Sequence, residues 1–265
     1  VRGFWIEHVR RCRKISAFMG GELKAFAVHN LWIPDGSKDI PFDRWTHRRH
    51  LKESLDEIFE TEYSPSRMRD SLESKLFGIG SEAFVVGSHE FYMGYALKKG
   101  KMVCLDLGHF HPTESIADKV SAILHFSDEL LLHVSRPMRW DSDHVVILND
   151  DTRSLAEEVV RGRALGRVHI ALDYFDGSMN RVGALVLGAR STLKAFLIAL
   201  LEPAASLRKA EDSENHFGRL ALLEELKTLP FGAVWNYYCL KMSVPPGADW
   251  LKAVEAYEKN VLSQR

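Results

Sequence analysis

Acidic and imidazole side chains recur along the middle of this 265-residue chain, most of them near the end of a short apolar run, and two further aspartates lie in the predicted polar loop Arg139–His144 after the fourth run. Carboxylate and imidazole donors suit hard divalent cations such as Mg²⁺ and Mn²⁺, and no thiolate is needed. Seven candidate ligands exceed what one ion requires, so the set predicts two ions bridged by a shared carboxylate. The candidates, with a lysine beside the first of them, are Glu73 and Lys75, Asp106 and His109, His133, Asp141 and Asp143, and Asp173.

Each of these residues has a simpler interpretation when it is taken alone. An aspartate at a strand end is more often a helix N-cap, by roughly two to one. His133 lies inside the apolar run LLLHV, where a hydrogen-bonded core histidine is the ordinary reading, and Lys75 can point to solvent. Recurrence in four successive units outweighs these separate readings, so the set itself is the signal.

Two other patterns compete with the metal hypothesis. Residues 78–83 fit the loose dinucleotide pattern GxGxx(G/A), with Asp106 a little over twenty residues further on. A lone match of this kind is unspecific, and we weigh a nucleotide site at about one in ten. The pair His109 and His111 has the spacing of a zinc hydrolase motif, but the flanking glycine and proline place it in a loop. His109 alone is therefore the favoured ligand.

Strand and helix patterns alternate around the candidate ligands. Helical patterns follow the apolar runs, and an opening helix from Gly3 to Met19 is expected to stop at Gly20-Gly21. Short apolar runs separated by helices are typical of a parallel sheet covered on both faces, and the carboxyl ends of such strands form the active site of a barrel. The predicted strands lie near residues 25–33, 72–77, 102–107, 130–134 and 168–173.

The predicted fold class is α/β, a partial (β/α)8 TIM barrel comprising about strands 4 to 8, with a helical C-terminal extension. A closed eight-stranded barrel needs roughly 250 residues for its units alone. Since five strands are counted here, we expect three earlier strand–helix units to be missing from this chain. Residues 1–190 are expected to form the partial barrel with the metal sites, and residues 191–265 an extension that packs on the barrel or on neighbouring subunits.

Composition narrows the class of protein further. The net charge is −1 with both signs interspersed, which gives no argument for nucleic acid or an anionic membrane as partner. Cys12, Cys104 and Cys239 lie far apart without CxxC spacing, which argues against a disulfide framework and a thiolate zinc site and fits a reducing cytosol. No apolar run of membrane-spanning length is expected; the longest lies around residues 195–201.

Long stretches of the chain resemble bacterial L-rhamnose isomerases, a family related in architecture to xylose isomerase. The similarity covers essentially the whole chain and continues through LLEP and LALLEELKTLP to AYEKNVLS near the end. The runs that carry it are NLWIPDGSKDIP (Asn30–Pro41), ESKLFGIGSEAFVVGSHEFYMGYAL (Glu73–Leu97), CLDLGHFHPTE (Cys104–Glu114), LLLHVSRPMRWDSDHVV (Leu130–Val146) and VHIALDYFDGSMNR (Val168–Arg181).

The resemblance implies a cytoplasmic homotetrameric enzyme that interconverts L-rhamnose and L-rhamnulose by metal-assisted hydrogen transfer between C1 and C2. Mn²⁺ is the expected cofactor, with two ions per site, and Mg²⁺, Co²⁺ and Zn²⁺ are alternatives. Lys75 would stabilise charge near the reactive carbonyl, and Asp173 would orient the water that moves the hydroxyl proton. By position, the structural metal would be held by Glu73, Asp106, His133 and Asp173, and the catalytic metal by His109, Asp141 and Asp143.

Several alternatives stay open at this stage. Within the class, a direct hydride shift competes with a cis-enediol path that uses a carboxylate or histidine base. Outside it, the acid–imidazole set also allows a metal-dependent hydrolase on the same barrel, or an inactive piece that binds metal weakly. The family's earlier strands, which supply a histidine and aromatic groups to the sugar pocket, are not in this chain. The preferred sugar among related aldoses and the physiological metal are likewise open.

Overall fold

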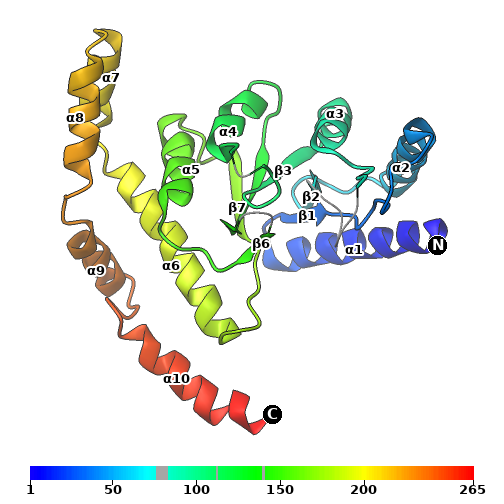
Figure 1. The fold of residues 1–265 in the computed structure, drawn as a ribbon. Coiled ribbons are helices and arrows are strands. Elements are labelled where there is room, and N and C mark those ends of the chain that lie inside the picture. Colours follow the sequence, from blue (N-terminus) through cyan, green and yellow to red (C-terminus); the bar gives the residue numbers. More distant parts are fainter. Residues whose placement is uncertain (76–82, 112, 139–140) are drawn as a thin grey trace. The chain divides into compact units, whose positions relative to one another are not determined.

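The computed structural model of the chain describes residues 1–75, 83–111, 113–138 and 141–265, with the backbone alone at 141–143. Figure 1 shows its elements, which group into two compact units. The first unit consists of Val1–His133, Pro137–Ser142 and Gly166–Asp173, and the second of Val134–Arg136, Asp143–Leu165 and Tyr174–Arg265. The predicted division after residue 190 stays a prediction.

A five-stranded sheet forms the centre of the first unit, in the order β1-β2-β3-β4-β7. The pairs β1–β2, β2–β3 and β3–β4 are parallel, so the predicted α/β class with a parallel sheet is confirmed. That these strands are about strands 4 to 8 of an eight-stranded barrel stays a prediction. The strands are β1 (Ala27–Leu31), β2 (Met68–Glu73), β3 (Met102–Asp106), β4 (Leu130–Val134) and β7 (Val168–Leu172).

The second strand begins earlier than its sequence pattern predicts. It starts at Met68 rather than residue 72 and ends at Glu73. The run MRDSLE looks polar, but Asp70 is 5% exposed and forms an ion pair with the buried Arg13, so a charged residue sits inside a buried strand. Because the strand ends at Glu73, this carboxylate lies at the carboxyl edge of the sheet, where Asp106 ends β3.

The first helix, α1 (Arg2–Leu23), continues through the two glycines where a stop was predicted. It ends instead at Lys24, whose φ of 53° is left-handed. Gly20 serves packing, since a Cβ there would lie 1.9 Å from the carbonyl oxygen of Arg67. The absence of a side chain thus lets α1 approach the residue that precedes β2.

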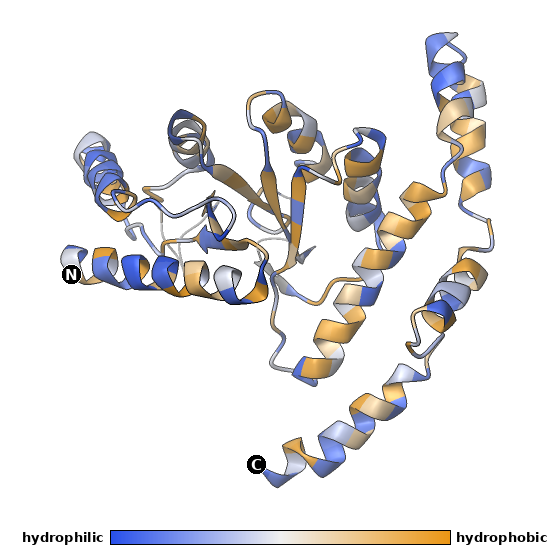
Figure 2. Cartoon of the chain, turned by 180° about the vertical axis from the view of Figure 1, so that it is seen from behind, coloured by the Kyte–Doolittle hydropathy of each residue, from blue (hydrophilic) through white to orange (hydrophobic). Residues whose placement is uncertain are grey.

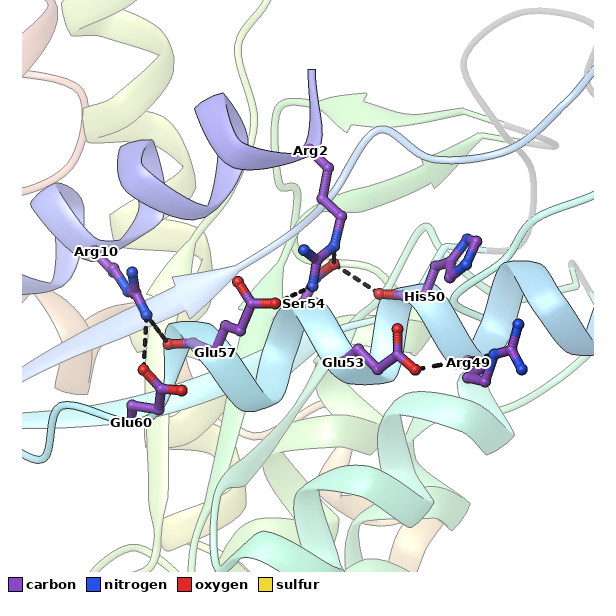
Figure 3. A network of polar contacts seen from close by, with 8 residues as sticks. All are labelled: Arg2, Arg10, Arg49, His50, Glu53, Ser54, Glu57 and Glu60. Carbon is purple, nitrogen blue, oxygen red and sulfur yellow. Dashed lines mark hydrogen bonds and ion pairs between the residues drawn. The ribbon is translucent and has the colours of Figure 1, made fainter.

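Helix α2 (Arg44–Ile58) packs against α1, and Figure 3 shows the polar contacts along their shared edge. Arg2 pairs with Glu57, and Arg10 Nη2 lies 2.9 Å from Glu60 Oε2. These pairs are exposed to solvent, where each contributes about 0–1 kcal/mol. Burial of apolar side chains between the helices is the larger stabilising effect.

The remaining elements follow in alternation and then as helices alone. In the first unit, α3 packs against β2 and β3, and α1 covers β1 and β2 (Figure 1). A two-stranded sheet of β5 and β6 occupies a stretch predicted as a polar loop. The further bounds are α3 (His89–Lys99), α4 (Ile116–Leu124), β5 (Arg136–Met138), β6 (Asp141–His144), α5 (Asp150–Arg161), α6 (Arg181–Leu200), α7 (Ala204–Asp212), α8 (His216–Leu226), α9 (Phe231–Lys241), α10 (Trp250–Asn260) and a final 3₁₀ turn (Leu262–Gln264).

Helix α6 corrects the expectation that no apolar run reaches membrane-spanning length. It has 20 residues and a mean hydropathy of 1.5, and by length and composition it is the single candidate span in the described part of the chain. In Figure 2, where the ribbon is coloured by residue hydropathy, much of this helix is orange, the colour of hydrophobic residues. The core helix of a soluble protein can have the same length and hydropathy. In α6, 44% of the most apolar stretch is buried, and Arg190 donates hydrogen bonds to the carbonyl oxygens of Pro245 and Gly247. One such helix is weak evidence for a membrane.

Candidate metal centre

Four of the predicted ligands meet at the carboxyl edge of the five-stranded sheet. Glu73 and Asp106 end β2 and β3, and the strand register places Asp106 beside His133 on β4. Asp173 directly follows β7. One ligand atom from each of the four side chains lies within 4.8 Å of the others. Parallel strands that end at one edge therefore bring together residues up to 100 positions apart.

The imidazole of His133 lies at the centre of this cluster. Its Nδ1 is 2.9 Å from Asp173 Oδ2, 3.2 Å from Glu73 Oε2 and 3.8 Å from Asp106 Oδ2. Glu73 and Asp106 are each 2% exposed, whereas the Asp173 side chain is 51% exposed. Three of the four residues are thus buried, and Asp173 is the one exposed to solvent.

His109 adds a second imidazole on the other oxygen of Glu73. Its Nδ1 lies 3.0 Å from Glu73 Oε1 and 2.9 Å from the carbonyl oxygen of Ser74. His111 points elsewhere: it is exposed, and its Nδ1 lies 2.7 Å from Thr113 Oγ1. The two histidines of the HxH motif therefore do not act as a pair, and His109 is the one that joins the cluster.

The protonation of the cluster is set by burial and by the crowding of its charges. Burial raises the pKa of Glu73, but the imidazoles of His109 and His133 outweigh it and hold that pKa at about 2. Burial raises the pKa of Asp106 to about 6, with His109 opposing the shift and Glu73 adding to it. Burial lowers the pKa of His109, yet the carboxylates of Glu73 and Asp106 raise it to about 9.

His133 follows the same pattern more strongly. Burial lowers its pKa, but the neighbouring Asp173, Cys104 and Glu73 raise it well above the ordinary value. Without a cation, positive charge on the imidazoles is thus what balances three crowded carboxylates. A bound divalent cation would take over that role.

The residues fit a divalent cation. Three carboxylates and an imidazole form the donor set that Mn²⁺ and similar ions accept. Glu73 Oε1 and His133 Nδ1 are buried, and neither has an aligned hydrogen-bond partner, although both lie close to opposite charges. Buried polar atoms without aligned partners are costly, and a metal ion would satisfy them. Metal binding by this set stays a prediction.

The second predicted ion has only one ligand whose side chain the structure describes. Asp141 and Asp143 lie in β6, and their side chains fall outside the described residues. The backbone there is extended, not a loop. Grouping of these aspartates with His109 therefore stays a prediction. The GxGxx(G/A) pattern at residues 78–83 also lies almost entirely outside the described residues.

Lys75 is buried, so the alternative in which it points to solvent is wrong. It is 6% exposed and donates to the carbonyl oxygen of Asp35. Its Nζ also lies 3.7 Å from Asp35 Oδ1 and 5.3 Å from the centroid of the Trp32 ring. Burial raises the pKa of Asp35, while Lys75 opposes that shift. Lys75 thus places a buried positive charge two residues after the cluster residue Glu73.

Several neighbours of the predicted ligands were not predicted from the sequence. Asn30 donates its amide to Glu73 Oε2, and Trp32 and Asp35 contact Lys75. All three lie in the run NLWIPDG that leaves β1, where polar and aromatic residues at a strand end were the available signal. Cys104 was missed as well, and its thiol lies within 4.8 Å of ligand atoms of Glu73 and His133.

Comparison with known proteins identifies the family. The family model described as L-rhamnose isomerase (RhaA) matches residues 1–265. Among curated relatives, a protein named L-rhamnose isomerase from Rhodopirellula baltica is 59% identical over the whole chain, which spans 62% of that relative. Those of Listeria innocua and Mannheimia succiniciproducens are 53% and 55% identical over the whole chain, and it covers 63% and 64% of their lengths. The chain thus spans less than two thirds of these relatives, and it belongs to the L-rhamnose isomerase family.

Proposed function

We propose that this protein contributes to a metal-dependent aldose–ketose isomerase that interconverts L-rhamnose and L-rhamnulose. The observation that carries the proposal is the convergence of Glu73, Asp106, His133 and Asp173 in a chain of this family. The relatives are named for the isomerisation of the same sugar. The chain spans less than two thirds of their length, so the reaction of the whole enzyme is part of the proposal.

Mn²⁺ is the cofactor we propose, with Mg²⁺, Co²⁺ or Zn²⁺ as alternatives. The four converging residues would hold one ion, and His109 with Asp141 and Asp143 would hold a second. Bound near the sugar, such an ion supplies Lewis acidity that polarises the carbonyl and favours the alkoxide. The extended backbone of β6 supports the second set, because residues two positions apart in an extended chain project from the same face and can share one ion.

Two side chains would act on the open-chain sugar directly. Asp173 is the cluster residue with the greatest exposure, so we assign it the task of orienting water and moving the proton between O1 and O2. Lys75, a buried ammonium held by Asp35, would stabilise negative charge on the substrate oxygen. Burial strengthens that interaction, since the surrounding dielectric is lower than that of water.

The proposed setting of the enzyme is a cytoplasmic homotetramer with a small sugar as its ligand. The resemblance to the family supports this setting. A sedimentation measurement on the protein tests the tetramer separately from the chemistry. Failure to form a tetramer would leave the metal cluster and its reaction untouched.

A turnover assay tests the proposed reaction. The 265-residue chain is compared with a longer version that carries the remaining segments of the Rhodopirellula baltica relative, and ketose formation from L-rhamnose is followed with Mn²⁺ and with chelator. We expect metal-dependent L-rhamnulose formation in the longer version. Hydrolysis of glycosides or esters without isomerisation would instead identify the competing hydrolase.

Two refinements decide what the first assay leaves open. Replacing Asp143 by Asn is expected to lower turnover by orders of magnitude while leaving the metal-free melting temperature nearly unchanged, because an anionic ligand is lost. A large fall in that melting temperature would assign Asp143 a structural role. Turnover in D₂O separates the two paths, since an enediol path exchanges the migrating hydrogen with solvent and a hydride shift retains it.

A further inference from the structure

Cys104 lies against the metal cluster, although the sequence offered no thiolate motif. It is fully buried in β3, and the strand register pairs it directly with Glu73 on β2. Cys104 and Asp106 are two positions apart on one strand, so both side chains project from the same face. The thiol, the Glu73 carboxylate and the His133 imidazole lie with one ligand atom each inside 4.8 Å.

Two atoms of this group are buried and lack an aligned hydrogen-bond partner. They are Glu73 Oε1 and His133 Nδ1, in residues that are 2% and 9% exposed. The three side chains together offer a donor set of one carboxylate oxygen, one sulfur and one imidazole nitrogen. Zn²⁺ and Cd²⁺ accept such a mixture readily, whereas Mn²⁺ prefers the oxygens of Asp106 and Asp173.

We propose that Glu73, Cys104 and His133 form an alternative site for thiophilic divalent cations such as Cd²⁺ or Zn²⁺. The sulfur–metal bond forms as the thiol releases its proton to solvent, as in other cysteine metal sites. Because Glu73 and His133 serve both sites, a thiophilic cation and a hard cation exclude each other. The proposal depends on donor geometry alone and stands whether or not the chain isomerises a sugar.

Cadmium titration of the 265-residue chain tests the site. Bound thiolate absorbs ultraviolet light by charge transfer to Cd²⁺, and we expect this absorption to saturate at one ion per chain. The chain offers two matched controls: Cys12, whose Sγ lies 3.7 Å from His8 Nε2 on α1, and Cys239, buried in α9. Cys104→Ser is expected to abolish the absorption, while Cys12→Ser and Cys239→Ser retain it. Persistence in Cys104→Ser, or loss in Cys12→Ser, would overturn the proposal.

A second measurement needs no substitution in the buried strand. Cadmium NMR of the unaltered chain distinguishes an ion bound to sulfur from one bound only to oxygen and nitrogen. A sulfur-type resonance is expected at the first equivalent of Cd²⁺, together with displacement of bound Mn²⁺ in a competition experiment. Glu73→Gln should weaken cadmium binding by roughly tenfold or more, since it removes a ligand. A resonance of the oxygen–nitrogen type alone would contradict the proposal.

Discussion

Two buried carboxylates three residues apart on strand β2 behave differently. Asp70 is paired on both oxygens by Arg13, whose Nε and Nη2 each lie 2.9 Å away, and Lys101 approaches within 3.3 Å. Burial raises the pKa of Asp70, but His29 and Arg13 outweigh that effect and bring it to about 2. This carboxylate is fully compensated by fixed positive charge.

Glu73, at the end of the same strand, is compensated in another way. Its described partners are the amide of Asn30 and the imidazoles of His109 and His133, which are groups that exchange protons or bind metals. One of its oxygens lacks an aligned hydrogen bond. A satisfied buried charge therefore marks the structural part of the strand, and an incompletely satisfied one marks the part prepared for a ligand.

The largest effect should come from breaking the satisfied pair. Asp70→Asn leaves the guanidinium of Arg13 buried without its partner, which costs about 3–5 kcal/mol. We expect urea unfolding without metal to show this loss, and Glu73→Gln on the same strand to show a much smaller one. Equal losses for the two variants would remove the distinction between them.

The pH dependence of unfolding should distinguish the metal cluster from the Asp70 pair, and this is the next largest effect. Against the lowering effect of burial, the carboxylates of Glu73 and Asp106 raise the pKa of His109 from its ordinary value of 6.5 to about 9 in the folded chain, so its stabilisation is complete below pH 6.5 and is lost as the pH rises to about 9. At 1.36 kcal/mol per pKa unit, the whole effect is about 3 kcal/mol. With chelator present, His109→Asn should lower the free energy of unfolding at pH 6. It should also make the loss of stability above pH 6 less steep, so that only the loss due to His133 remains. Parallel curves for both proteins would contradict the assignment.

Addition of Mn²⁺ should stabilise the chain through the metal cluster and not through the Asp70 pair. A ligand that binds only the folded state stabilises it by about 2.7 kcal/mol at a concentration 100 times its Kd. Mn²⁺ is expected to raise the unfolding midpoint of the unaltered chain and of Arg2→Ala, but not that of Asp106→Asn. A rise of the same size in Asp106→Asn would show that the ion binds elsewhere.

The smallest effect concerns the exposed pair Arg2 and Glu57 between α1 and α2. Both side chains are more than 40% exposed, and surface pairs of this kind contribute about 0–1 kcal/mol. Arg2→Ala should therefore shift the urea midpoint slightly and lose even that difference in high salt. A loss comparable to that of Asp70→Asn would mean that exposure does not explain the ranking.

Most of the sheet could be predicted from the sequence, and the wrongly predicted element bounds have physical reasons. Four strands follow continuous apolar runs and were placed within about two residues. The start of β2 was predicted too late, because the charged Asp70 makes the beginning of this buried strand look like an exposed segment. The end of α1 was predicted too early, because Gly20 is required for packing rather than for termination of the helix. Tertiary contacts overrode the local pattern at both positions.

The site was predictable to a similar degree. Recurrence of acids and imidazoles at strand ends pointed to the four residues that converge. Asn30, Trp32 and Cys104 were missed, because amide, aromatic and lone thiol side chains carry no metal signature of their own. The strand register places Cys104 beside Glu73, and Asn30 donates to the same carboxylate, whereas Trp32 lies over the ammonium of Lys75.

The most direct test of the central claim is a Mn²⁺ titration of the 265-residue chain, with free Mn²⁺ followed by electron paramagnetic resonance. Asp106→Asn serves as the variant, and Arg2→Ala, at an exposed position outside the cluster, serves as the control. We predict saturable binding by the unaltered chain and by Arg2→Ala, and a loss of affinity of roughly 100-fold in Asp106→Asn, since a buried anionic ligand is removed. Equal affinity in all three proteins would contradict a metal centre at the edge of the sheet.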